Sequence, residues 1–230
     1  MMDVVFLITT CNREESCQRL VDALQDQGRI YVLNDGCDYD ISGAYQTKLR
    51  MRLGKRGYWR TINCLYKGRG NAKYYFQLPD DFLPVPDMVN KAIEIWESID
   101  DNKKVCLNLY ADRIGKPCWT GVMPTEFDNY RKTQWVDMCF MCEEKFFTTL
   151  GTLPTIDLGW GINSKKSSGV GAYISKFLNK KGYGLYQVKE SLVIPQDEHF
   201  LASQMLYSND TNSWNSNSAR TRIITDTRSK

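Results

Sequence analysis

Histidine is almost absent from this chain: His199 is the only one among 230 residues. A zinc site needs several Cys or His ligands at regular spacings, and the lone Cys139-x-x-Cys142 pair has neither a second pair nor a nearby histidine. Free cysteine is among the most buried residue types. The eight cysteines are scattered, several of them in apolar runs, and we expect this pair to be buried free thiols.

Long apolar runs are missing as well. No run approaches the roughly 20 residues that cross a bilayer. The opening segment, 1–8, lacks a basic n-region and a small-residue cleavage site, so it predicts a strand rather than a signal peptide. We expect a cytoplasmic protein with no membrane partner. The chain has 42% apolar and 25% charged residues and is long enough to bury one substantial core.

Positive charge is in only small excess, with a net charge of +3. The positive charges are nevertheless unevenly distributed, and many gather in one segment: Lys48, Arg50, Arg52, Lys55, Arg56 and Arg60, followed by Lys67, Arg69 and Lys73. This segment predicts either a solvated basic loop or a patch that faces phosphates.

The first half alternates strand and helix patterns. A strand is predicted over 3–9, and a second one over 29–33. Between them Asn12 and Glu15 have the spacing of a capping box, and Gly28 fits the position after a helix. Strand, helix and strand within about 30 residues predict a parallel βαβ unit.

The pattern continues along the chain. We expect a polar connection over 37–56, followed by a helix over 58–67 and a strand over 73–78. A second helix is predicted over 86–99, beginning at Pro86, and a further strand over 105–110. In the second half we predict strands over 135–142 and 183–188, and a helix over 143–150. Another helix is capped by Ser167 or Ser168 and closed by Gly182. We thus predict that residues 1–207 form one α/β domain with a mostly parallel sheet, divided into the halves 1–100 and 101–207. Residues 208–230 are predicted to form a polar tail.

Polar side chains follow the predicted strands of the first half. Thr9–Arg13, Asn34–Gly36 and Asp80-Asp81 lie at strand ends, and the segment from Arg60 to Asn63 adds a fourth group. Taken singly, Asn12 is explained as a cap and Asp35-Gly36 as a turn. Together they predict a ligand site, because the carboxyl ends of parallel strands face one crevice. The paired carboxylates suit a hard divalent cation that holds a diphosphate.

Three of these segments resemble the GT-A glycosyltransferases. Val4-Val-Phe-Leu-Ile-Thr-Thr-Cys-Asn-Arg13 is similar to their opening strand, Ile30-Tyr-Val-Leu-Asn-Asp-Gly-Cys-Asp38 to their Val-Val-Asp-Asp-Gly-Ser segment, and Gln77-Leu-Pro-Asp-Asp-Phe-Leu-Pro84 to their Asp-x-Asp segment. The resemblance implies a Rossmann-like GT-A sandwich that binds a UDP-sugar and uses Mn2+ or Mg2+.

The resemblance also implies roles for individual residues. Asp35 would accept a hydrogen bond from uracil, and Asp81 would bind the metal. The remaining residues that would contact the nucleotide-sugar are Thr9, Thr10, Asn12, Arg13, Gly36, Arg60, Asn63 and Asp80. One position departs from the family: Pro79 stands where its first aspartate is found. Either Asp80 substitutes, or the metal is held more weakly.

The second half would complete the site. His199 follows the last predicted strand, where GT-A enzymes commonly have a metal-binding histidine, although it comes four residues later than usual. The alternative is an exposed histidine in an acidic turn. A transferase that inverts the anomeric centre needs a general base, and the carboxyl that we predict for this role is Asp137, with Asp112 and Asp157 as alternatives.

Three shorter segments resemble the phage GT-A enzymes that glycosylate hydroxymethylated pyrimidines in DNA: Gly57-Tyr-Trp-Arg60, Ser167-Ser-Gly-Val-Gly171 and Glu190-Ser-Leu-Val193. This resemblance implies a DNA acceptor in an infected bacterial cytoplasm, which agrees with the basic segment. The alternatives are a polysaccharide acceptor, an inactive nucleotide-binding GT-A module, and a nucleotidyltransferase. The Asn34-Asp35-Gly36 segment argues against the last.

Overall fold

The structure is a computed structural model that describes residues 3–111, 121–136, 138–155 and 169–196. Within these ranges the chain forms a nine-stranded sheet in the order β3-β2-β1-β4-β9-β6-β10-β8-β7 and a separate pair, β11-β5. No helix among the described residues is long and apolar enough to cross a membrane.

The first half of the sheet is parallel. β1 (Val4–Thr10), α1 (Glu14–Leu24) and β2 (Arg29–Asn34) form the predicted βαβ unit, with β2 on one side of β1 and β4 (Tyr74–Pro79) on the other. β3 (Tyr45–Lys48) adds a parallel edge strand to β2. The sequence analysis missed β3, which is short and mostly exposed and therefore carries no buried apolar pattern.

The second half introduces antiparallel strands. β9 (Phe140–Cys142) runs antiparallel between β4 and β6 (Lys104–Asn108), and β10 (Gly184–Val188) is parallel to β6. Beyond β10 lie β8 (Tyr130–Thr133) and β7 (Thr125–Glu126), both antiparallel to their neighbours. The centre is mostly parallel, as predicted.

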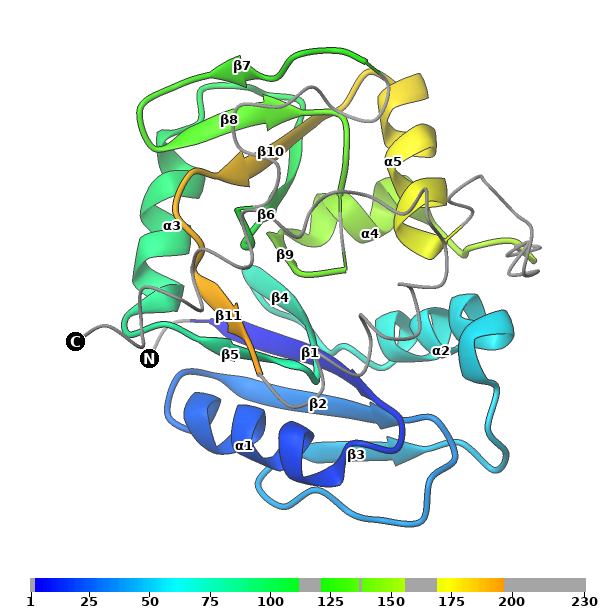
Figure 1. Cartoon of the computed structure of the whole chain (residues 1–230). Helices are drawn as coiled ribbons and strands as arrows, with labels where there is room; N and C mark the ends of the chain where they lie inside the picture. The colour runs from blue at the N-terminus through cyan, green and yellow to red at the C-terminus, as the bar shows by residue number, and fades with distance from the viewer. Residues whose placement is uncertain (1–2, 112–120, 137, 156–168, 197–230) are drawn as a thin grey trace, which may run out of the picture.

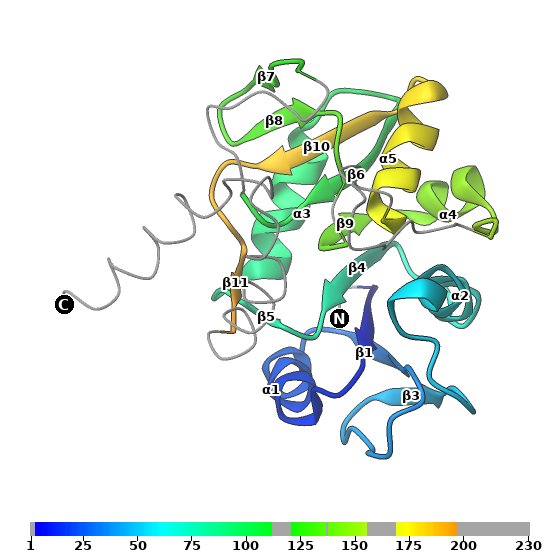
Figure 2. The same cartoon turned by 45° about the vertical axis from the view of Figure 1, so that its right-hand side comes forward.

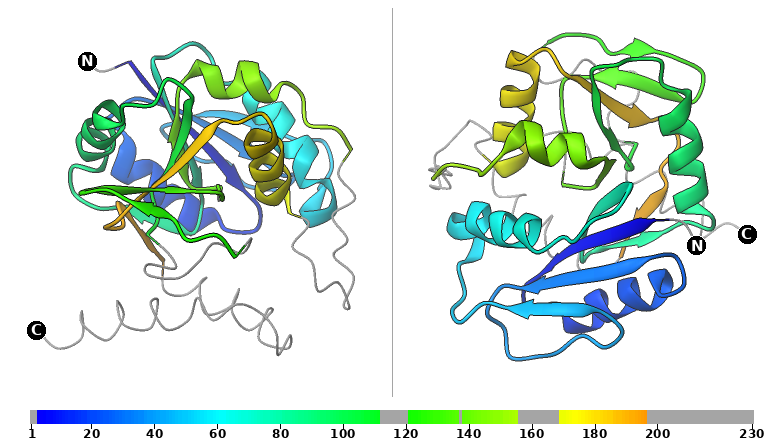
Figure 3. Two further views of the ribbon diagram at one scale, coloured as in Figure 1. Left: turned by 90° about the horizontal axis from the view of Figure 1, so that it is seen from above. Right: turned by 180° about the vertical axis from the view of Figure 1, so that it is seen from behind.

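Helices cover both faces of the sheet. α1 and α3 (Met88–Ser98) pack on one face, while α2 (Gly54–Lys67), α4 (Glu144–Leu150) and α5 (Val170–Lys180) pack on the other (Figures 1 and 3). Each helix turns an apolar stripe to the sheet, as Met88, Val89 and Trp96 of α3 do. The result is the predicted α/β sandwich.

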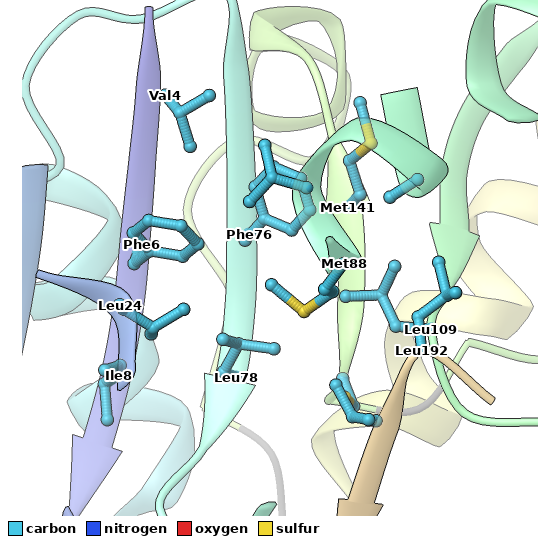
Figure 4. Packing of buried hydrophobic residues seen from close by; sticks show 14 of the residues in the cluster. Val4, Phe6, Ile8, Leu24, Phe76, Leu78, Met88, Leu109, Met141 and Leu192 are labelled. Carbon is cyan, nitrogen blue, oxygen red and sulfur yellow. The ribbon is translucent and has the colours of Figure 1, made fainter. Parts of the chain in front are cut away.

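Alternation along the central strands builds two cores. Phe6 and Phe76 lie on the α1 and α3 side of β1 and β4, with ring centroids 5.4 Å apart (Figure 4). Leu7 and Tyr75 belong to the core on the opposite face. Cys139 and Cys142 are buried free thiols, one in each core, which confirms the prediction for this pair.

A short two-stranded sheet brings the end of the described chain back to β4. β5 (Phe82–Pro84) follows β4 after two residues and pairs antiparallel with β11 (Val193–Pro195). β5 packs beside α1, and β11 lies along β5 (Figure 2). This return was not predicted from the sequence.

Several predicted boundaries were wrong. Asn12 does not cap α1, because its φ is 56° and the helix begins at Glu14 without a side-chain cap. Gly28 does not end α1, which stops at Leu24; a Cβ on Gly28 would meet the carbonyl oxygen of Val4 at 2.6 Å, so a glycine permits the turn to approach β1.

Two other elements also begin later than predicted. Pro86 precedes α3, whose N-cap is Asp87, and β9 begins at Phe140 rather than at Trp135. The predicted caps Ser167 and Ser168 and the tail 208–230 lie outside the described residues.

Candidate functional site

The acidic pair lies in the tight turn between β4 and β5. Pro79 ends β4 in register with Thr9 of β1, so the strands deliver Asp80-Asp81 and Thr9-Thr10 to the same edge. Asp80 is 4% exposed, whereas the side chain of Asp81 is 19% exposed. Asp81 is therefore the more accessible of the two carboxylates.

Gln196 fixes this turn from the far end of the chain. Its backbone N–H donates to the carbonyl of Asp81 at 2.8 Å, and its side-chain amide donates to the carbonyl of Asp80 at 3.1 Å. Arg19 of α1 donates to the side-chain oxygen of Gln196 at 2.9 Å. The sequence analysis missed Gln196, because its partners lie more than a hundred positions earlier in the chain.

Arg13 is the cationic partner of both carboxylates. Its Nη1 lies 2.9 Å from Oδ1 of Asp80 and 3.0 Å from Oδ2 of Asp81. Although burial lowers the pKa of Arg13, the two carboxylates raise it above its ordinary value. Arg13 therefore stays charged and bridges α1 to the acidic turn.

The second oxygen of Asp80 has no partner. Oδ2 is buried and makes no hydrogen bond of good geometry with any described group. Burial raises the pKa of Asp80 to about 6, since the charged form loses its water; Arg13 and the nearby hydroxyl of Thr10 oppose this effect, and Asp81 adds to it. A buried carboxylate oxygen without a donor is a site that favours a cation.

A tyrosine secures the loop after β1. The hydroxyl of Tyr39 shares a hydrogen bond with Thr10 Oγ1 at 2.7 Å and accepts from the backbone N–H of Arg13 at 3.3 Å. Thr9 points to the other face of the sheet, where its hydroxyl shares a hydrogen bond with Tyr58 of α2 at 3.2 Å. The two threonines thus help to join this edge to different layers.

The loop after β2 folds over the same edge. Asn34 holds it, since its amide donates to the carbonyl of Cys37 at 3.1 Å and accepts from the N–H of that residue at 2.8 Å. Asp35 is 5% exposed, and its Oδ1 accepts from the N–H of Leu53 at 2.9 Å. The Asp35 carboxylate is therefore positioned by the segment that leads into α2.

The segment that leads into α2 approaches the loop after β2 most closely where Arg52 lies against Gly36. A Cβ on Gly36, whose φ is 75°, would lie 2.5 Å from the backbone nitrogen of Arg52. The guanidinium of Arg52 donates at 2.9 Å to the side-chain oxygen of Asn12, once that amide is oriented with its oxygen toward it. Arg52 is exposed at this edge. Arg52 was predicted as part of the basic segment but not as a site residue.

Arg60 and Asn63 of α2 have other contacts. Arg60 is exposed and stacks over Trp59 at 4.9 Å from the ring centroid. Asn63 donates to the carbonyl of Leu153 and accepts from its N–H, both at 2.9 Å. These contacts give Asn63 a structural role that joins α2 to the segment after α4.

The carboxyls predicted for the second half, Asp137, Asp112 and Asp157, lie outside the described residues, as does His199. The chain just before Asp137 is held by α5, because Ser175 accepts from the N–H of Val136 at 2.9 Å. Gln196, the last described residue, lies three positions before His199.

The described donors suit a hard divalent cation. Among the residues that the structure describes, no cluster of three His, Cys, Asp or Glu side chains could enclose a metal. The Asp80-Asp81 pair matches the way Mg2+ is bound in many enzymes, by one or two carboxylates together with waters and substrate phosphates. The unpartnered Oδ2 of Asp80 fits this role.

Comparison with solved structures supports the fold. The chain is similar to a crystal structure of GalNAc-T7 with UDP, GalNAc and Mn2+, with a TM-score of 0.62 at 13% identity. The match covers 84% of this chain and 43% of that one, so this chain spans less than half the length of GalNAc-T7. A197 from STIV matches at a TM-score of 0.42 and 11% identity, over 84% of this chain and 83% of that one.

Sequence comparisons give no relatives: no family model matches the chain, and neither does any curated protein. The fold is GT-A, a mixed α/β sandwich whose sheet is mostly parallel in the centre, as in the GalNAc-T7 structure.

Proposed function

We propose that this protein is a glycosyltransferase that moves a hexose or pentose from a UDP-sugar to a hydroxyl acceptor. The observation that carries the proposal is the convergence of three strand-end segments, those of Arg13, Asp35 and the Asp80-Asp81 pair, at one edge of a GT-A sheet. GalNAc-T7, which shares the fold, was crystallised with UDP and Mn2+, and this supports the choice of donor and metal.

In this proposal the first half binds the nucleotide. The Asp35 carboxylate accepts from uracil N3–H, and Leu53 holds it in place. Asn12 and Arg52, which contact each other, lie beside it at the exposed rim. Arg13 supplies positive charge to the diphosphate. Thr9, Thr10, Gly36 and Arg60 also belong to the predicted pocket.

Asp80 and Asp81 would hold Mn2+ or Mg2+ in this proposal, and His199 is proposed as a third ligand. When bound, the cation neutralises charge on the departing diphosphate. Asp81 is suited to a direct bond because it reaches solvent, while Asp80 offers the buried oxygen that lacks a donor. Asp137 is proposed to take the proton of the acceptor hydroxyl.

We further propose that the acceptor is a hydroxymethylated pyrimidine in DNA. Residues 41–79 contain nine Lys and Arg and no Asp or Glu, so the other residues together carry a net charge of +3 − 9 = −6. β3, α2 and the chain between them lie in this segment, where Lys48, Arg50, Arg52, Arg60 and Lys67 are exposed. Segregated positive charge of this kind suits a phosphate backbone.

Binding and consumption of UDP-sugars test the proposal. We expect UDP to bind more tightly than ADP or GDP in calorimetry, and Mn2+ to support release of UDP from a sugar donor. Asp81→Asn should abolish release while the thermal unfolding curve stays that of a folded protein. Equal binding of all three nucleotides, or full release by Asp81→Asn, would contradict the assignment.

A further inference from the structure

The acidic turn already has an occupant with positive charge. One guanidinium nitrogen of Arg13 lies within 3.0 Å of both carboxylates, and the proposed function assigns a divalent cation to the same two groups. A guanidinium and a divalent cation repel each other at such short range. Arg13 and the cation therefore compete for the Asp80-Asp81 pair.

The contacts of Arg13 allow its side chain to leave without disturbing the fold. Its backbone is fixed, because its N–H donates to Tyr39 and its carbonyl accepts from the N–H of Cys17 at 2.9 Å. The side chain is 29% exposed, and no other partner of its guanidinium appears among the described contacts. Rotation about side-chain bonds alone can carry the charged group from the carboxylates to solvent or to a bound anion.

The carboxylates, by contrast, cannot follow. The turn is held by the contacts of Gln196 with the backbone of Asp80 and Asp81. Asp80 is buried, and a buried carboxylate without a counter-ion is strongly unfavourable. Some cation must therefore stay at this turn whenever Asp80 is ionised.

We propose that Arg13 is the resident counter-ion of the acidic turn in the ligand-free protein, and that it moves to the diphosphate when a nucleotide and a divalent cation bind together. The inference rests on the proposed function, since it takes Asp80 and Asp81 as the cation site. A further consequence is that the protein binds a free divalent cation weakly, because Arg13 must first be displaced from the carboxylates. A diphosphate removes this penalty by offering the guanidinium a new anionic partner.

The direct test is to measure Mn2+ binding without nucleotide, using the electron paramagnetic resonance signal of free Mn2+ to determine how much is unbound. Arg13→Gln removes the competing charge and keeps a polar side chain, so we expect it to bind Mn2+ about tenfold more tightly than wild type, the effect of one nearby charge on a carboxylate. Arg29→Gln is the control, because it removes an exposed Arg that pairs with Asp3 away from the site. Its affinity for Mn2+ should equal that of wild type.

A second variant at the same position separates the charge of Arg13 from the geometry of its guanidinium. Arg13→Lys keeps the charge but loses the paired geometry of the guanidinium, and its Mn2+ affinity should lie between those of wild type and Arg13→Gln. In wild type, UDP should tighten Mn2+ binding by more than its own chelation accounts for. By reciprocal coupling this excess should shrink in Arg13→Gln.

Two outcomes distinguish the proposed cation site from the proposed role of Arg13. If wild type and both Arg13 variants bind Mn2+ with equal affinity while Asp81→Asn does not bind it, the cation site stands and the role of Arg13 is overturned. If no variant binds Mn2+ with or without UDP, the cation site itself is overturned and the inference with it.

Discussion

Arg13 and Asp80 form an ion pair of 2.9 Å that joins the start of α1 to the end of β4. The pair matters because it connects two of the three segments from which the sequence predicts a nucleotide-sugar site. It also leaves one oxygen of Asp80 buried without a donor.

Protonation of Asp80 should make the ligand-free protein more stable at low pH. Its pKa of about 6 lies above the ordinary 3.8, so the folded state holds this proton more tightly than the unfolded state. The contribution of Asp80 is fully present below about pH 4 and is lost as the pH rises through 6. Asp80→Asn, which mimics the protonated form, should stabilise the protein at pH 7 by up to roughly 3 kcal/mol.

Urea denaturation at pH 4.5 and pH 7 checks this, with exposed Asp22→Asn of α1 as the matched control. The advantage of Asp80→Asn over wild type should grow between the two pH values, and that of Asp22→Asn should not. An advantage that is the same at both pH values would show that Asp80 does not titrate in this window.

Gly36→Ala should destabilise the fold more than Gly121→Ala. Both glycines have positive φ, 75° and 81°, so each substitution strains the backbone. At Gly36 the added Cβ would also meet backbone atoms of Met51 and Arg52 within 2.6 Å, whereas at Gly121 no atom of the described residues lies within 4 Å. We expect an extra loss of about 1–3 kcal/mol at Gly36 in chemical denaturation. Equal losses would show that the loop after β2 moves aside freely.

How much of this could be predicted from the sequence depended on burial. β1, β2 and β4 were predicted because most of their residues are apolar and buried, and α3 because its apolar residues recur at helical spacing. β3 and β7 are short and largely exposed at the edges of the nine-stranded sheet, and β11 has only three residues, so none of them carries such a signal.

The candidate site divides in the same way. Its acidic turn and strand ends are local features that a sequence displays. The contact of Gln196 with Asp80 and that of Arg52 with Asn12 depend on how distant segments fold together. Asn12 was assigned to a helix cap on its spacing, but its left-handed backbone places it in the loop instead.

Asp35→Asn should change base preference rather than abolish nucleotide binding. The amide can still accept from the N–H of Leu53, so the loop should keep its shape. Its NH2 would face uracil N3–H donor to donor, and we expect UDP affinity to fall by about 1–3 kcal/mol, whereas CDP, whose ring N3 is an acceptor, should lose less. Calorimetry with both nucleotides measures this. An equal loss for UDP and CDP would mean that Asp35 does not contact the base.

Neutralising the basic segment should weaken DNA binding and its salt dependence. Arg50 and Lys67 are exposed near the two ends of α2, outside the nucleotide pocket. Each contact with a phosphate contributes about 0.9 to the slope of log affinity against log salt, so Arg50→Gln and Lys67→Gln together should lower the slope by about 2. Exposed Lys91→Gln of α3 serves as the control. An unchanged slope in the double variant would favour a polysaccharide acceptor.

Sugar transfer tests the central claim most directly. The protein is incubated with Mn2+, a panel of UDP-sugars and either hydroxymethylpyrimidine DNA or plain DNA, and the nucleosides are weighed by mass spectrometry while UDP release is followed. We predict that wild type adds one sugar to the hydroxymethylated nucleoside only, and that Asp81→Asn adds none. A folded wild-type protein that neither binds UDP nor releases it from any donor would contradict the account.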